Sequence, residues 1–245
     1  MKEHHRIYGI RAIIEAINAD EPVDKVFIQK GLKGDLSREL ETLIRRKGIS
    51  TSYVPVEKLN RLSSENHQGV VASISPIAYQ PFEELAEKIL EKEKLPLFLL
   101  LDQLSDVRNF GAIIRTAECT GVDGIIIPKH GSAPLTADAI KTSAGAAFNI
   151  PIAKVDHLKD AIFYLQASGL TVVAATEKTK DTLYNIQLNV PLAIVMGAED
   201  KGVSPSVLKS VYHHAKLPML GEIASLNVSV ACGVFLYEVL RQRLD

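Results

Sequence analysis

Apolar and polar residues repeat with two different periods along this chain, and these periods predict its strands and helices. Residues 23–29 alternate at every second position, which is typical of a half-buried strand. Residues 97–101 form a short, unbroken apolar run, as expected of a strand buried on both faces of a parallel sheet. Between such segments, apolar residues recur three or four positions apart, which is helical spacing. Strands and helices therefore alternate, and the pattern predicts an α/β fold.

The first part of the chain, residues 1–75, predicts a small α/β domain. Helices are expected at residues 11–18, 35–47 and 56–62, and strands at 23–29, 49–54 and from His67 to about residue 75. Residues 76–95 are expected to form a linker and a first helix. A proline precedes an amphipathic segment there, and alternating Glu and Lys residues follow it.

Residues 96–245 predict a second α/β domain, built on a parallel sheet. Strands are expected at residues 97–101, 124–127, 150–153, 170–174 and 192–195, with helices at 112–120, 136–144, 157–167 and 204–210. Ser225 is the expected N-cap of a last helix, which carries Leu226, Val230, Val234 and Tyr237 at helical spacing. This succession is typical of a doubly wound sheet.

Composition limits the class of protein. The 245 residues are 47% hydrophobic and 23% charged, as in ordinary globular proteins of one or two domains. The net charge is -1, so a nucleic-acid site must be a local patch. Residues 1–75 carry twelve Lys and Arg against ten Asp and Glu. Within them, Arg45, Arg46 and Lys47 either complement the dipole at a helix end or contact RNA.

The two cysteines and the absence of long apolar runs indicate a cytoplasmic protein. Cys119 and Cys232 lie in apolar helical patterns, and we expect both to be buried thiols in a reducing compartment. They are too few to form a zinc site by themselves, and we expect no metal. No apolar run approaches the roughly 20 residues that span a bilayer, and the N-terminus has no apolar signal core.

The usual nucleotide-binding motifs are missing. No G-x-G-x-x-G follows the first strand of the second domain. Gly197 and Gly202 have the spacing of a P-loop start, but Val203 and Ser204 follow where that loop requires Lys and Ser or Thr. Neither a dinucleotide site nor a phosphate-cleaving loop is supported.

Three other stretches carry candidate chemistry: residues 109–117 (NFGAIIRTA), 196–202 (MGAEDKG) and 217–231 (LPMLGEIASLNVSVA). In the third, a glycine-containing loop leads into a helix start, where free N–H groups bind polar or anionic groups. An ordinary loop and capped helix would show the same pattern. In this order, the three stretches resemble the signature motifs of the SpoU-type RNA 2′-O-methyltransferases of the SPOUT superfamily. Residues 1–75 also resemble the substrate-binding domain of the 23S ribosomal RNA guanosine branch.

The resemblance implies an architecture. Residues 1–75 would be an L30e-like RNA-binding domain, and residues 96–245 a SPOUT domain with a deep C-terminal trefoil knot that holds S-adenosylmethionine. Related enzymes are obligate homodimers, in which the arginine of the first motif reaches toward the partner's cofactor site. The apolar last helix would supply the dimer interface, or would be buried within one chain.

The resemblance also assigns roles. Catalytic residues would be Asn109, Arg115, Glu199, Ser225 and Asn227. Arginine stays charged in proteins, so Arg115 would clamp a phosphate, and either this phosphate or a perturbed guanidinium would accept the proton. The residues implied to bind the cofactor are Thr176, Met196, Gly197, Leu217, Met219, Ser225 and Leu226, and those implied to bind RNA are Arg45, Arg46, Lys47, His67 and Gln68.

The expected function is therefore transfer of a methyl group from S-adenosylmethionine to a ribose 2′-hydroxyl, in a guanosine of 23S ribosomal RNA. Two alternatives stay open. One is the same reaction on tRNA, against which the separate N-terminal domain argues. The other is a non-catalytic RNA-binding assembly factor, which would bind RNA without the cofactor.

Overall fold

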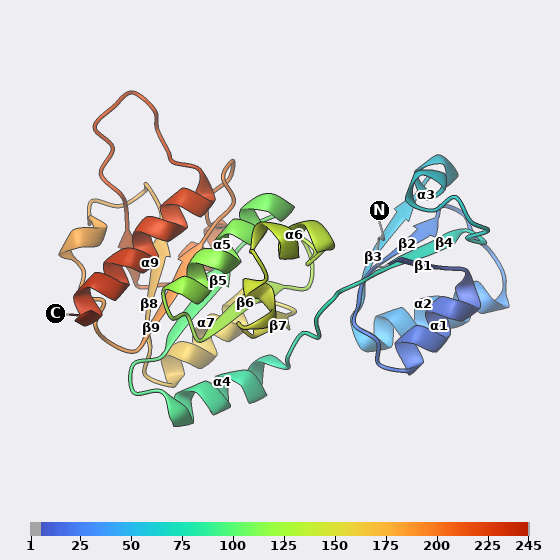
Figure 1. Cartoon of the computed structure of the whole chain (residues 1–245), viewed down its shortest axis with the longest axis horizontal. Helices are drawn as coiled ribbons and strands as arrows, with labels where there is room; N and C mark the ends of the chain where they lie inside the picture. Colours follow the sequence, from blue (N-terminus) through green and yellow to red (C-terminus); the bar gives the residue numbers. More distant parts are fainter. Residues whose placement is uncertain (1–5, 245) are drawn as a thin grey trace. The chain divides into compact units, whose positions relative to one another are not determined.

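The chain forms two compact units in the computed structural model, which describes residues 6–244 (Figure 1). The first unit comprises the residues up to Ala78, with the short segment 134–137 grouped with it. The second unit comprises residues 79–133 and the chain from 138 onward. Both units mix helices and strands, so the expected α/β class is confirmed.

The first unit has a mixed four-stranded sheet in the order β1-β4-β2-β3. Its elements are β1 (Arg6–Tyr8), α1 (Ile10–Asn18), β2 (Val23–Gln29), α2 (Asp35–Lys47), β3 (Ser50–Val54), α3 (Val56–Leu62) and β4 (Val70–Ile74). Alternate residues of β2 divide between the two faces of the sheet. Val26 and Ile28 are buried against α1 and α2, whereas Phe27 packs beside Leu59 and Leu62 of α3. The two-residue period of the strand is thus satisfied by helices on both sides.

The second unit has a six-stranded parallel sheet in the order β10-β8-β9-β5-β6-β7. Its strands are β5 (Leu97–Leu101), β6 (Gly124–Pro128), β7 (Ile152–Val155), β8 (Thr171–Ala175), β9 (Leu192–Met196) and β10 (His213–Ala215). Its helices are α4 (Phe82–Lys92), α5 (Val107–Cys119), α6 (Ala137–Thr142), α7 (Leu158–Ala167), α8 (Pro205–Leu208) and α9 (Val228–Leu244), with 3-10 turns at Ala146–Phe148 and Leu183–Asn185. The expected parallel sheet is confirmed.

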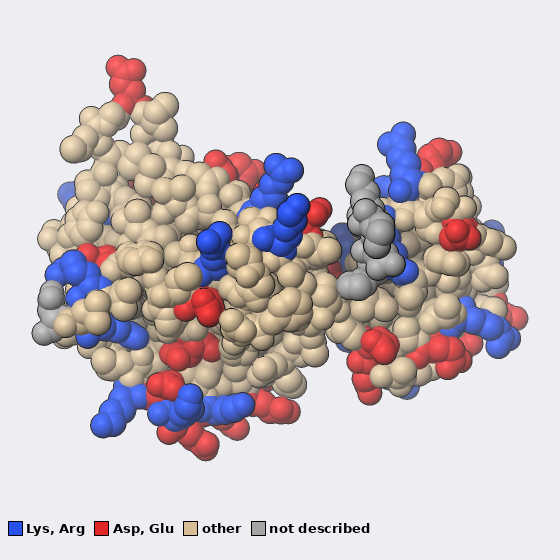
Figure 2. All heavy atoms as spheres, viewed as in Figure 1, with Lys and Arg blue, Asp and Glu red and all other residues tan. Residues whose placement is uncertain are grey.

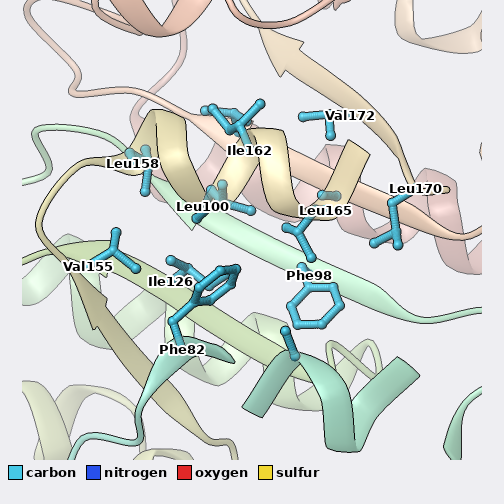
Figure 3. Packing of buried hydrophobic residues seen from close by; sticks show 14 of the residues in the cluster. Phe82, Phe98, Leu100, Ile126, Val155, Leu158, Ile162, Leu165, Leu170 and Val172 are labelled. Carbon is cyan, nitrogen blue, oxygen red and sulfur yellow. The ribbon is translucent and has the colours of Figure 1, made fainter. Parts of the chain in front are cut away.

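Helices cover both faces of this sheet. On one face, Phe98 and Leu100 of β5 pack against α4 and α7 in a core that includes Phe82, Ile162 and Leu165 (Figure 3). On the other face, α5 and α9 lie side by side (Figure 1). All five residues of β5 and of β9 are buried, which explains their continuous apolar sequence.

The end of the chain corrects one prediction. Helix α9 begins at Val228, not after Ser225, and the N-cap position is occupied by Asn227, whose side-chain oxygen accepts from Ser229 N at 3.0 Å. Near its other end, Arg243 donates to the carbonyls of Leu95 at 2.8 Å and Val190 at 2.9 Å. These bonds tie the last helix to the segments entering β5 and β9. The deep knot implied by the resemblance stays a prediction.

Further details differ from the sequence expectations, and α5 begins at Val107 rather than at residue 112. Strands β1 and β10, of three residues each, were not expected. Cys119 is exposed rather than buried, because it ends α5 on the outer side of the helix. Cys232 is fully buried, as expected, and this burial raises the pKa of its thiol to about 12.

Within residues 6–244, no helix is long and apolar enough to cross a membrane.

Candidate active site

The carboxyl ends of β8, β9 and β10 open into one pocket of about 410 Å³. Ala175, Met196 and Ala215 end these strands and line its floor. The loop of residues 216–227 and the start of α9 form further walls. Ligands of parallel α/β sheets bind beyond the carboxyl ends of the strands, so this is where the fold alone favours a ligand.

Gly197 shapes this pocket through a close approach of backbone to backbone. The loop after β9 folds back on itself, and Gly202 N donates to Ala198 O at 2.8 Å. A Cβ atom on Gly197 would lie 2.0 Å from the carbonyl carbon of Gly202 and 2.1 Å from Val203 N. No side chain fits there, so a glycine is required for the loop to hold this form.

Three polar side chains from distant parts of the chain meet at the edge of the pocket. Asn227 Nδ2 donates to Asn109 Oδ1 at 3.1 Å and to Glu199 Oε2 at 3.0 Å. Asn109 Nδ2 donates to the same Glu199 oxygen at 3.4 Å. We call these residues the amide–carboxylate cluster. It connects the first turn of α5, the loop after β9 and the start of α9, so each of the three sequence motifs contributes one member.

Local structure orients the members of this cluster. Asp106 caps α5 by accepting from Asn109 N at 2.7 Å, which holds Asn109 in the first turn. The Asn227 oxygen accepts from Ser229, so its amide nitrogen faces the other two members. Buried Asp102, at the end of β5, accepts from Ser204 N at 2.7 Å and so links β5 to the segment after the Gly197 loop.

The residues predicted to bind a cofactor lie around this one pocket. Its lining includes all seven of them: Thr176, Met196, Gly197, Leu217, Met219, Ser225 and Leu226. Sequence reasoning missed Lys178, Lys216 and Phe235, which also line it. Lys216 directly follows β10, whose three residues carried no clear strand signal. Phe235 lies two turns into α9, and its burial was visible only as one apolar residue among many.

Arg115 is not brought to this cluster within one chain. It follows Asn109 by six residues on α5, which turns it to a different side of the helix. Its side chain is exposed, and it does not line the pocket. Figure 2 shows basic side chains on the surface over α5 and α6. A role for Arg115 in the same reaction would therefore require a second copy of the chain or a ligand that spans the two positions.

The predicted RNA-binding residues of the first unit occupy two places. Arg45, Arg46 and Lys47 form the last turn of α2, where Lys47 pairs with Asp20 at 2.7 Å and Arg45 with Glu41 at 3.9 Å. The hydrogen bond with Lys47 lowers the pKa of Asp20.

His67 and Gln68 belong to the tight turn before β4. His67 Nδ1 accepts from Gly69 N at 3.0 Å, so Nε2 carries the proton and donates to Asn60 at 2.8 Å. Gln68 is exposed, with a φ of 51°. The ring of His67 is thus used to build the turn.

The fold and the pocket define a class: a two-unit α/β protein whose parallel sheet carries a ligand pocket at its carboxyl edge, with an amide–carboxylate cluster beside it. Comparison with known proteins identifies the family. Residues 96–237 match the SpoU rRNA Methylase family, and residues 6–80 match the family described as RNA 2'-O ribose methyltransferase substrate binding. The chain belongs to the SpoU rRNA Methylase family.

One relative and two solved structures illustrate this membership. YacO of Bacillus subtilis (strain 168), named as a TrmH family tRNA/rRNA methyltransferase, is 37% identical over 243 residues, 99% of this chain and 97% of that one. The SpoU methyltransferase AviRb from Streptomyces viridochromogenes, solved in complex with the cofactor AdoMet, has a TM-score of 0.62 at 22% identity and covers 98% of this chain and 90% of its own. The TrmH/SpoU tRNA modifying enzyme of A. aeolicus has a TM-score of 0.56 at 29% identity, over 66% of this chain and 82% of its own.

Proposed function

We propose that this protein transfers a methyl group from S-adenosylmethionine to a ribose 2′-hydroxyl of RNA, in a guanosine of 23S ribosomal RNA. The observation that carries the proposal is the amide–carboxylate cluster, in which each of the three motifs places one side chain beside the pocket. Family membership supports methyl transfer to RNA, and the family description of residues 6–80 supports the ribose hydroxyl as acceptor. A ribosomal RNA substrate means that the reaction takes place in the cytoplasm.

The residues around the pocket suit S-adenosylmethionine. A volume of about 410 Å³ lies within the range of ligand pockets, roughly 300–1,000 Å³. Leu217, Met219 and Leu226 offer apolar surface for an adenine ring, while Thr176 and Ser225 offer hydroxyl groups for polar parts of the ligand. Gly197 lines the pocket and allows the loop after β9 to fold back against it, which gives this part of the wall its form. When bound, the cofactor supplies an electrophilic methyl group.

The chain's own residues position the acceptor. In-line displacement needs the hydroxyl oxygen on the axis of the bond that breaks, and such positioning contributes several kcal/mol. We assign this task to Asn109 and Asn227, whose amide groups Glu199 holds in place. Ser225, in the loop between the pocket and α9, would bind the ribose or the cofactor. Arg115 would bind the neighbouring phosphate through its guanidinium, which stays charged.

A homodimer would complete this site. The exposed side of α9 carries Val230 (52% exposed) and Tyr237 (55% exposed), with Val234 between them. Such an apolar stripe on an outer helix favours contact with a second copy. Across a twofold axis, Arg115 of one subunit would serve the cluster of the other. Tyr237→Asp should therefore give a monomer in sedimentation, whereas Phe163→Asp, at a position on α7 of equal exposure (54%), should leave the dimer intact.

Mixed dimers test whether the active site is shared. Arg115→Ala and Asn227→Ala chains should each be inactive alone. If Arg115 acts across the interface, unfolding and refolding them together in equal amounts restores about a quarter of the wild-type activity, because half of the dimers are mixed and each has one intact site. Mixed dimers that form but stay inactive would place Arg115 in its own chain's reaction and overturn the shared site.

Substrate choice is tested with purified protein, methyl-labelled S-adenosylmethionine and two unmodified RNAs, a 23S central-loop fragment and bulk tRNA. Label in an alkali-resistant dinucleotide that contains guanosine, from the 23S fragment, supports the proposal. If only tRNA is labelled, the proposed reaction is correct but its substrate is tRNA. The likeness to the tRNA modifying enzyme extends over only 66% of this chain, which favours the ribosomal substrate. RNA binding with neither methylation nor cofactor binding in calorimetry would indicate an assembly factor instead.

A further inference from the structure

Two lysines converge on one aromatic ring in the first unit. Lys25 Nζ lies 5.4 Å and Lys58 Nζ 5.8 Å from the centroid of the Phe27 ring. Within residues 6–244, neither lysine forms an ion pair with a carboxylate. The ring quadrupole stabilises each ammonium group only modestly, by about 0.5–1 kcal/mol at an exposed site. Two like charges on one ring therefore form a local centre of positive charge that an anion would stabilise.

The sheet register surrounds this centre with polar and aromatic groups. Phe27 of β2 pairs with Val71 of β4, which in turn pairs with Tyr8 of β1. These residues form one row across the sheet, and their side chains point to the same face. The next row holds Arg6, Ser73, Lys25 and Ser50 on four adjacent strands. An aromatic row thus lies beside a row of cations and hydroxyl groups.

Only part of this face is covered. Helices α1 and α2 lie on the opposite side of the sheet, and among the described residues of this unit the short helix α3 is what packs on this side (Figure 1). Leu59 of α3 is buried against Val54 and Val71, at the carboxyl end of β3. Tyr8 stays 42% exposed, and Lys25 and Ser50 are partly exposed. The face formed by Arg6, Tyr8, Lys25, Phe27, Ser50, Ser73 and Lys58 is called the basic sheet face below.

The other basic cluster of this unit differs because acidic side chains lie beside its cations. At the end of α2, Lys47 pairs with Asp20 and Arg45 with Glu41, so two of its three charges already have acidic neighbours. An exposed ring also lies near this cluster, but its hydroxyl is already engaged, because Tyr53 donates to Glu41, the same carboxylate that pairs with Arg45, at 3.1 Å. Among the described residues, two lysines without an acidic partner therefore share one ring on the basic sheet face and not at the helix end, although the helix end has the more conspicuous sequence.

We propose that the basic sheet face binds single-stranded RNA, with a backbone phosphate between Lys25 and Lys58 and a base stacked on Tyr8. Single-stranded nucleic acids bind surfaces that combine cations along the backbone path with aromatic rings for the bases. Hydroxyl groups of Ser50 and Ser73 add hydrogen-bonding partners for ribose and phosphate. This inference rests on the proposed function, since it assigns a surface to the RNA that is methylated.

The test compares two pairs of substitutions in the full-length protein. Lys25→Gln/Lys58→Gln removes two charges from the basic sheet face, and Arg46→Gln/Lys47→Gln removes two from the helix end as a matched control. The probe is the 23S central-loop fragment, whose dissociation constant is measured from 50 to 200 mM salt. Circular dichroism and calorimetric binding of S-adenosylmethionine verify that each variant is folded. Lys25→Arg/Lys58→Arg tests whether charge alone restores binding.

We expect Lys25→Gln/Lys58→Gln to weaken RNA binding roughly tenfold and to lower the slope of log K against log salt by about 1, the effect of one lost phosphate contact. The control should stay within about twofold, and the double arginine variant should bind like the wild type. In methylation, KM for RNA should rise while kcat at saturating RNA persists. The proposal is overturned if both glutamine pairs weaken RNA binding equally, or if Lys25→Gln/Lys58→Gln does not weaken it.

Failure of the proposed function would look different. A wild-type protein that binds both RNA and cofactor without methylating would refute the enzyme reaction, while the binding comparison between the two pairs would still decide the surface. A photo-crosslink from 4-thiouridine in the bound fragment to Tyr8 would support stacking at this position. Crosslinks confined to the end of α2 would contradict it.

Discussion

The two sheets of this protein put their side chains to different uses. In the second unit, β5 is buried along its whole length and enclosed by helices on both faces, and the candidate ligand pocket opens at the carboxyl ends of β8, β9 and β10. In the first unit, the described residues cover one face of the mixed sheet with α1 and α2 and the other only partly, with α3. A fully enclosed parallel sheet offers an edge that positions a few groups closely, whereas a half-open sheet offers a broad surface. Under the proposed function, the edge would carry out the chemistry and the open face would bind the RNA.

The largest effect is expected from closing the edge pocket. Gly197→Ala would put a Cβ atom 2.0 Å from the Gly202 carbonyl carbon, so the loop must move and the pocket should lose its cofactor site. Calorimetry should detect no S-adenosylmethionine binding, and methylation should vanish. Gly221→Ala is the control, because nothing lies within 4 Å of its Cβ position and its loop also borders the pocket. Normal binding by Gly197→Ala would mean that this loop does not shape the site.

The next effect separates the two tasks of Asn227. Asn227→Ala removes the amide that joins Asn109 to Glu199 and also the cap of α9. We expect kcat to fall by roughly a hundredfold or more, the scale of a lost positioning contact, and the free energy of unfolding to fall by about 1 kcal/mol for the cap.

Asn227→Ser separates these losses, because serine also caps helices but cannot bridge the cluster. Its stability should return toward wild type while its activity stays low. Should Asn227→Ser recover both, the cluster would matter only for folding.

A smaller effect on function is expected from destabilising the first unit, because its sheet and the sheet that carries the pocket have separate cores. Leu59 is fully buried, but in a small group formed with Val54 and Val71 under α3. Leu59→Ala should cost about 2–5 kcal/mol, as large-to-small core substitutions do, and should lower the melting temperature of the first unit. S-adenosylmethionine affinity should not change, since the pocket lies wholly in the second unit. A matched loss of cofactor binding would show that the units fold as one.

The smallest effect is a pH dependence at the end of α9. Hydrogen bonds from Arg241 and Gln242 lower the pKa of Glu238, with Arg241 the larger cause. A lowered pKa in the folded state contributes stability above the ordinary pKa of Glu, and this contribution is lost as pH falls through the lowered value. Glu238→Gln should therefore lose less stability than wild type between pH 7 and pH 3, by less than about 1 kcal/mol. Identical pH profiles in urea titrations would contradict this.

Sequence patterns predicted the second sheet well, because continuous burial makes strands such as β5 and β9 stand out as apolar runs. Short edge strands such as β1 and β10 lack such runs, since three residues at an edge need little burial. The start of α9 was placed too early, because Ser225 and Asn227 are both good caps and only the hydrogen bond to Ser229 distinguishes them. Cys119 was misplaced because an apolar pattern does not tell which side of α5 faces solvent.

The sequence by itself determined the family, the alternation of strands and helices, and the residues that carry the motifs, because these follow from local order and residue type. Tertiary structure alone decided which of them meet. It joined Asn109, Glu199 and Asn227 across up to 118 residues, and it left Arg115 on another side of α5. It also gathered Lys25 and Lys58 on Phe27, which no spacing along the chain indicates. The physical reason is that strand register and helix packing create contacts between residues whose positions along the chain are unrelated.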